Sequence, residues 1–196
     1  MVVPLLLKGG ADMFASSRKN RGFTLIEVLV TLLILAIGLL GLAGLHTTML
    51  RTELEALQRS QAILLLEDMA NRLRSNPAVA RNAASAYLGE YGVGTSLADC
   101  SSPVNADKCA WDTALDGAAV ESSNGENIGA MIGARGCVER LSGGASTQVL
   151  LRVTVAWQGL SPTVAPELSC GEGDYGDDDS LRRAVSVVVA LAYLGV

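Results

Sequence analysis

The most constraining feature of this sequence is a long apolar run near its N-terminus. From Phe23 to Leu45 the chain has 23 residues, and Glu27 is the only charged residue among them. An α-helix rises 1.5 Å per residue, so this run covers about 34 Å, enough to cross a hydrocarbon layer of about 30 Å. Residues 1–22 carry four basic side chains and one acidic side chain. By the positive-inside rule, we predict a membrane-spanning helix with a cytoplasmic N-terminus and an exported remainder.

A signal peptide and a plain membrane anchor are the simpler interpretations of this run. A signal peptide has about 7–15 apolar residues followed by a small-residue cleavage site, whereas this run is longer and leads into a charged helical pattern. A plain anchor does not explain Glu27, because a carboxylate within a bilayer costs at least about 2.5 kcal/mol and is normally paired. Glu27 lies one helical turn after Phe23, on the same face. Cleavage between Gly22 and Phe23 would therefore create an α-ammonium group that Glu27 can neutralise.

The sequence around this junction, Lys19 to Gly22 followed by Phe23 to Val30, resembles the class III signal of type IV prepilins and type II secretion pseudopilins. In that family a membrane-bound prepilin peptidase cuts after the glycine and methylates the new N-terminal residue. The resemblance implies that Gly22 precedes the cut, that Phe23 becomes the N-methylated residue, and that Glu27 docks the subunit into a growing fibre. An alternative start at Met13 would leave a leader of ten residues before the cut.

The helical pattern continues past residue 45. The acid Glu55 precedes the base Arg59 by four positions, the favourable order for an ion pair on one helix. Pro77 disfavours helical geometry in the residue before it, so the helix should end near Arg74 or Ser75. We expect the apolar stripe of this segment to pack on a sheet of the chain's own head. Its members are Leu50, Leu54, Leu57, Ala62, Leu65, Met69 and Leu73.

The expected fold class is α+β, with the long helix packed against a small antiparallel sheet. The predicted parts are a removed leader, residues 1–22; a transmembrane and fibre-core helix, 23–45; the exported half of the same helix, 46–75; and a globular head, 76–196. Alternating apolar side chains predict three strands, at residues 137–141, 149–157 and 184–193. Residues 91–135 are predicted as mainly irregular, with short elements around Trp111 and Ile128.

All four cysteines lie in the predicted head. An even number of cysteines in an oxidising compartment indicates two disulfides, for which three connectivities are possible. We favour Cys100–Cys109, which closes a short loop, and Cys137–Cys170, which ties the first predicted strand to a later loop. A zinc site or a nucleophilic cysteine is disfavoured, because the chain has no Cys-x-x-Cys pair and its single histidine, His46, lies at the membrane end.

Composition and residue spacing exclude other classes of function. With 49% hydrophobic and 18% charged residues the chain is not a disordered protein, and 15 Lys+Arg against 20 Asp+Glu disfavour a nucleic-acid partner. Residues 77–196 contain no Ser/His/Asp, Cys/His or metal-spaced set, so no catalytic residue, metal or cofactor is predicted. The acidic segment 172–179 lacks the spacing of a calcium-binding hand and is interpreted as a solvated loop.

The resemblance implies a minor pilin of the type IV pilus, and the valine-rich strands of the head look like those of PilV-type minor pilins. Such a subunit takes part in pilus priming or in a tip complex, and hence in twitching motility and adhesion. The implied partners are the prepilin peptidase, other minor pilins, the major pilin and the inner-membrane assembly platform. Its location would be the inner membrane, with the head in the periplasm, and later the pilus. The alternatives are a minor pseudopilin of a type II secretion system and a membrane-tethered exported adhesin or ligand-binding module.

Overall fold

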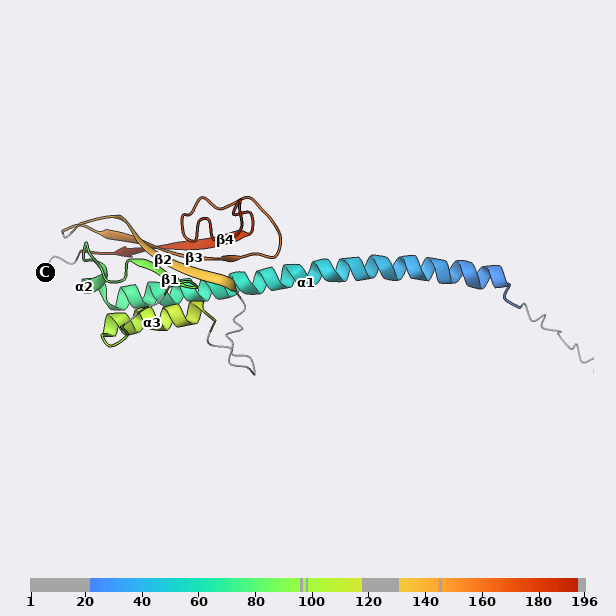
Figure 1. Cartoon of the computed structure of the whole chain (residues 1–196), viewed down its shortest axis with the longest axis horizontal. Helices are drawn as coiled ribbons and strands as arrows, with labels where there is room; N and C mark the ends of the chain where they lie inside the picture. Colours follow the sequence, from blue (N-terminus) through green and yellow to red (C-terminus); the bar gives the residue numbers. More distant parts are fainter. Residues whose placement is uncertain (1–21, 96, 98, 118–130, 145, 194–196) are drawn as a thin grey trace, which may run out of the picture. The chain divides into compact units, whose positions relative to one another are not determined.

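The computed structural model describes residues 22–95, 97, 99–117, 131–144 and 146–193. The predicted leader up to Arg21 and the predicted element around Ile128 lie outside these residues. The elements in chain order (Figure 1) are α1, Leu25–Ser75; α2, Pro77–Ala80; β1, Gly89–Gly92; α3, Pro103–Leu115; β2, Ile132–Ser142; β3, Val149–Gln158; and β4, Arg182–Leu191. This arrangement confirms the α+β class.

The chain divides into two compact units, residues 1–46 and 47–196, and α1 contributes to both. In the first unit, every described side chain from residue 22 to 46 is exposed. This part of α1 is long and apolar enough to cross a membrane. The helix ends at Ser75, as the proline at position 77 predicts. The backbone of Asn76 has left the helical region, with φ −120° and ψ 57°.

The second unit contains one antiparallel sheet in the order β1-β2-β3-β4. Val153 in β3 lies opposite Val138 of β2 on one side and Val187 of β4 on the other. The predicted meander of three strands is therefore confirmed, with differences at its edges. Strands β2 and β4 begin earlier than predicted, at Ile132 and Arg182, and the short strand β1 adds a fourth member.

The core lies between the sheet and the last turns of α1. Alternate residues of β3 point the same way because side chains alternate across a strand, and all five are buried: Val149, Leu151, Val153, Val155 and Trp157. The helix contributes its own buried residues to the same cluster: Ala62, Leu66, Met69, Ala70 and Leu73. The direction in which the β3 side chains face was thus correctly predicted from alternation alone.

The expectation that the whole apolar stripe of α1 packs on the sheet is wrong for its first part. Leu50, Leu54 and Leu57 are 45%, 51% and 57% exposed. At 100° per residue, these leucines lie on a face next to the one that carries Gln58 and Ala62, both of which are buried. The sheet therefore covers an adjacent face of the helix, and three leucines remain open to solvent.

Helix α3 occupies a region that was expected to be mainly irregular. Its N-cap is Ser102, whose hydroxyl accepts a hydrogen bond from the backbone N–H of Asn105 (3.1 Å). The indole of Trp111 is fully buried and donates a hydrogen bond to the carbonyl of Leu65 in α1 (2.9 Å). Its ring meets that of Tyr91 edge to face, with the centroids 5.1 Å apart. The expected short element around Trp111 is thus a full helix beside α1 (Figure 1).

Asp107 of α3 ties this helix to the end of α1. Its carboxylate accepts hydrogen bonds from the hydroxyl of Tyr87 (2.8 Å), the guanidinium of Arg72 (2.9 Å) and the side-chain amide of Asn76 (3.3 Å). Burial and the hydrogen bond to Asp107 raise the pKa of Tyr87 to about 12. Three side chains near the end of α1 therefore share one acceptor on α3.

The loop between β3 and β4 covers part of the outer face of the sheet. Cys170 and Tyr175 of this loop pack on Ala156, and the Tyr175 hydroxyl donates a hydrogen bond to the carbonyl of Gly133 (2.7 Å). The disulfide Cys137–Cys170 joins the loop to β2, with the two Cα atoms 5.8 Å apart. The loop is therefore a packed layer of the head.

We expect the head to lose stability in alkaline solution partly through Tyr175. Burial, the main cause, raises the pKa of Tyr175 to about 12 from 10.0. Since the folded value is the higher one, the unfolded chain releases this proton first. The contribution of the protonated Tyr175 hydroxyl to the stability of the head is therefore complete below about pH 10. It is lost as the pH rises towards about 12. The measurement is the free energy of unfolding in urea between about pH 8 and 11.

The variant Tyr175→Phe should reduce this alkaline decline. It should also cost about 1 kcal/mol at about pH 8, because the hydrogen bond to the Gly133 carbonyl is lost. The matched control is Tyr193→Phe, since Tyr193 is 46% exposed and this variant should keep the wild-type decline. A decline of wild-type size in Tyr175→Phe would contradict the assignment.

Candidate functional site

The first turn of α1 is capped by Thr24. The backbone N–H of Glu27 donates to the carbonyl (3.1 Å) and to the hydroxyl oxygen (3.3 Å) of Thr24, and the N–H of Val28 also reaches that carbonyl (3.3 Å). A threonine followed three residues later by a glutamate is the capping-box pattern, in which the threonine serves as N-cap. This role of Thr24 is not among the expectations from the sequence, although the Thr-x-x-Glu spacing carries the signal. The helix therefore begins directly after Thr24.

The peptide bond between Gly22 and Phe23 lies just outside this cap. Both residues are exposed, and Phe23 retains 82% of its accessible surface. A Cβ atom added to Gly22 would meet no atom of the described residues within 4 Å, the chain neighbours apart, and Gly22 does not adopt a positive φ. The described chain therefore imposes no requirement for glycine at this position. A requirement for glycine here would have to come from another molecule that binds this segment of the chain.

Glu27 lies on the exposed surface of α1, in the first turn of the helix. In the described part of the chain its carboxylate forms no hydrogen bond or ion pair. A negative charge in this turn interacts favourably with the positive end of the helix dipole, typically by about 0.3–1 kcal/mol at an exposed site. The structure thus brings Gly22, Phe23 and Glu27 together at one helix end, with the carboxylate available to a cation.

The four predicted disulfide residues lie in the second unit. The structure joins Cys100 to Cys109 and Cys137 to Cys170, the pairing favoured from the sequence, with Cα–Cα separations of 5.9 and 5.8 Å. The first disulfide ties α3 to the segment before it. The second ties the long loop between β3 and β4 to the sheet. Each closed loop stabilises the head by about 2–4 kcal/mol.

The acidic segment 172–179 is organised by an arginine of the same chain. The Asp179 carboxylate accepts hydrogen bonds from the backbone N–H groups of Gly173 (2.8 Å) and Tyr175 (3.4 Å). It also forms an ion pair with the buried guanidinium of Arg182 (3.1 Å), which donates in turn to the carbonyl of Cys170 (3.1 Å). Among the described residues there is no cluster of three or more side chains suited to a metal ion. The pattern of acids along the sequence did not reveal this arginine partner.

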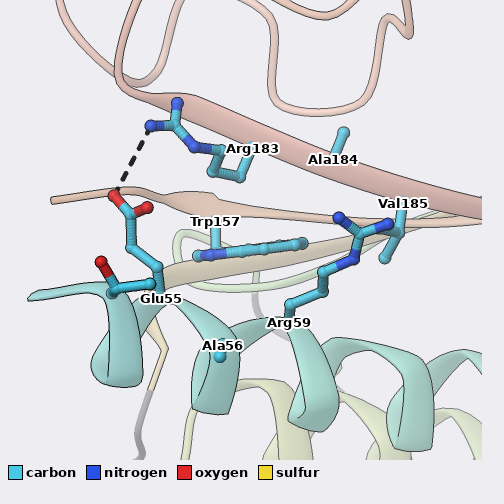
Figure 2. Close-up of a pocket in the computed structure, with 8 residues that line it drawn as sticks. Glu55, Ala56, Arg59, Trp157, Arg183, Ala184 and Val185 are labelled. Atoms are coloured by element: carbon cyan, nitrogen blue, oxygen red, sulfur yellow. Dashed lines mark ion pairs between the residues drawn. The ribbon is translucent and has the colours of Figure 1, made fainter. Parts of the chain in front are cut away.

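A pocket in the second unit lies between α1 and the ends of β3 and β4 (Figure 2). Its volume is about 380 Å³. One side contains an ion pair between Glu55 of α1 and Arg183 of β4, with 3.7 Å between oxygen and nitrogen. The predicted partner of Glu55, Arg59, instead lies on the other side of Trp157. The residues that line the pocket are Thr52, Glu55, Ala56, Arg59, Trp157, Arg183, Ala184 and Val185.

Residues 17–43 match the prokaryotic N-terminal methylation motif. The match includes Gly22, Phe23, Glu27 and the start of α1. Together with the long apolar helix and the small antiparallel sheet, it indicates a type IV pilin-like or pseudopilin-like protein. Comparison with curated proteins and with solved structures found no match to this chain. The motif covers a small part of the 196 residues, and the whole head lies outside it.

The motif carries general properties of the class. It implies processing by a prepilin peptidase and assembly with other pilins. Proteins with this motif are generally structural subunits and not enzymes. The apolar helix near the N-terminus is consistent with membrane anchoring of a prepilin.

Proposed function

We propose that this protein is a minor pilin of the type IV pilus, cleaved between Gly22 and Phe23 and N-methylated on Phe23. The observation that carries the proposal is the exposed Gly22–Phe23 peptide, placed directly before the N-cap Thr24 within the matched motif. A peptide bond outside the helix can enter a protease active site without unwinding a turn. The resemblance of the valine-rich strands to PilV-type heads supports a minor subunit.

Glu27 is the proposed docking residue. It is the only charged residue between Phe23 and Leu45, and a carboxylate without a cation is costly inside a membrane. Cleavage supplies the α-ammonium group of Phe23, either in the same chain or in a neighbouring subunit. The ammonium group of a neighbouring subunit would neutralise Glu27 only in the assembled fibre. The carboxylate would therefore favour insertion of the subunit to the depth at which these two charges meet.

The proposed location is the inner membrane, with the N-terminus in the cytoplasm and the head in the periplasm. The basic residues before the apolar run support this orientation. The two disulfides support it independently, because such bonds persist in oxidising compartments and are rare in the cytoplasm. After assembly the subunit would occupy the pilus, in contact with other minor pilins, the major pilin and the assembly platform.

The experiment that tests this function compares the wild type with Glu27→Ala in cells that assemble the fibre. The wild-type N-terminal peptide should begin at Phe23 and carry one methyl group by mass spectrometry. Glu27→Ala should still be cleaved, but its content in sheared fibres should fall by at least about tenfold, which corresponds to about 1.4 kcal/mol. The reason is that the variant has no carboxylate to pair with the new ammonium group.

The matched control is Glu67→Ala, which removes an exposed carboxylate from the head half of the same helix. It should be processed and incorporated like the wild type. Native protein that retains its leader and still functions would contradict the proposal. Deletion of the gene should impair twitching motility; a loss of protein secretion with normal motility would instead assign the protein to a type II secretion fibre.

A further inference from the structure

The pocket between α1 and the ends of β3 and β4 has one wall that is held in place by the fold. The Arg183 guanidinium donates hydrogen bonds to the hydroxyl of Thr163 (2.6 Å) and the carbonyl of Ser180 (3.3 Å). A Cβ atom at Gly159 would lie 2.8 Å from the guanidinium carbon, so the glycine leaves the room that Arg183 occupies. This wall is therefore formed before any ligand binds.

The opposite wall carries a second guanidinium group, that of Arg59. Figure 2 shows the side chains of Glu55 and Arg59 rising from α1 on either side of Trp157. Glu55 pairs with Arg183, and within the described part of the chain no residue forms a hydrogen bond or ion pair with the Arg59 side chain. The pocket lining therefore contains one carboxylate and two guanidinium groups, and its residues sum to a charge of +1. An anion is the complementary ligand.

The pocket continues into an apolar surface of α1. Ala56 lines both the pocket and a neighbouring groove of about 390 Å³, whose other lining residues are Glu53, Leu57 and Ser60. Leu57, which lines this groove, is 57% exposed. The small side chain at position 56 lets another helix approach closely. A ligand that fills both the pocket and the groove therefore needs an acidic group next to apolar groups. A free small anion has no such apolar groups.

We propose that this surface docks a helix of a second pilin-like subunit, and that an Asp or Glu of that helix enters the pocket beside Arg59 and Trp157. The inference rests on the proposed function, because it assumes that the chain assembles with other pilins. A single carboxylate suits the site better than a doubly charged phosphate, since Glu55 already lies in the wall. The planar guanidinium of Arg59 can donate paired hydrogen bonds to both oxygens of a carboxylate.

The test uses a photo-reactive amino acid at Thr52, which is exposed and lines the pocket. The full-length protein is expressed in cells that hold the complete set of fibre subunits, irradiated, and digested for mass spectrometry. We expect a cross-linked peptide from the N-terminal helix of another processed pilin, with an Asp or Glu within one turn of the linked residue. Arg59→Glu should reduce the yield at least about tenfold, and Arg59→Lys should retain most of it, because a lysine keeps the charge that the acid needs.

The control is Arg51→Glu, the same charge reversal on α1 at an exposed residue that does not line the pocket; the yield should stay close to that of the wild type. Reversing the identified partner acid to Arg should restore cross-linking to the Arg59→Glu variant. Cross-links to lipid only, or a yield that Arg59→Glu leaves unchanged, would overturn the docking proposal. Cleavage after Gly22 is measured in the same samples, so failure of the docking site is distinguished from failure of the pilin assignment, in which the leader would remain.

Discussion

Gly22→Ala is expected to leave the precursor uncut in the membrane, with its leader still present. We expect the cleavage rate to fall at least about 100-fold, equivalent to about 2.7 kcal/mol of transition-state stabilisation. The measurement is the ratio of precursor to mature chain, followed over time by mass or gel mobility, together with the mass of the N-terminal peptide. One methyl group is expected to have so large an effect because the peptidase, and not the fold of this chain, requires glycine at this position.

The structure makes this prediction informative, because the alanine methyl group has open space around it. Among the described residues, the chain neighbours apart, no atom lies within 4 Å of the added Cβ, and α1 begins only after Thr24. The variant chain should therefore fold and insert normally, and any loss of cleavage reports recognition by the peptidase. The matched control is Gly38→Ala, another site with open space, which lies inside the helix and should be cleaved at the wild-type rate. Normal cleavage of Gly22→Ala would refute the leader assignment.

Trp111→Ala should strongly destabilise the head. Truncating a buried tryptophan typically costs about 3–5 kcal/mol, through lost transfer energy and the cavity left behind. Trp111 is fully buried, and the truncation removes a hydrogen bond to Leu65 and a ring contact with Tyr91. The indole also occupies the space beside Gly136, where an added Cβ would collide with it. Since Gly136 has no side chain, it cannot fill the cavity from that side.

A loss of this size is a large share of the roughly 5–15 kcal/mol by which domains are usually stable. The measurement is urea unfolding of the purified full-length protein in detergent, followed by near-ultraviolet circular dichroism of the head. The control is Val164→Ala, because Val164 is 93% exposed and its truncation should change the unfolding free energy by less than about 0.5 kcal/mol. A cost below about 1 kcal/mol for Trp111→Ala would show that α3 is not part of the head core, since core truncations exceed that value.

Local patterns predicted several parts of this protein correctly. The alternation of apolar residues located β3 and its inward face, on which Leu151 and Val153 are both buried. The proline at position 77 marked the end of α1, and the spacing of cysteines favoured the two disulfides that the structure contains. In each case the signal lies within a few residues, or follows from a small number of possible pairings.

Other parts could not be derived because they depend on residues far apart in the sequence. Helix α3 lies in a region rich in small polar residues, and its stability depends on contacts such as that of Trp111 with α1. The exposure of Leu54 depends on which face of the helix the sheet covers. Glu55 has a favourable helical neighbour in Arg59, yet it pairs with Arg183, which the fold of the β3–β4 loop brings to it.

The sequence by itself determined the N-terminal segment, because the apolar run and the methylation motif are read from residues within a few helical turns of one another. The tertiary structure alone decided which face of α1 is buried, which cation meets Glu55, and where Arg59 and its pocket lie. These features arise from contacts between segments that are distant in the sequence. The free energy of those contacts depends on the packing of the whole head, so no short sequence pattern encodes it.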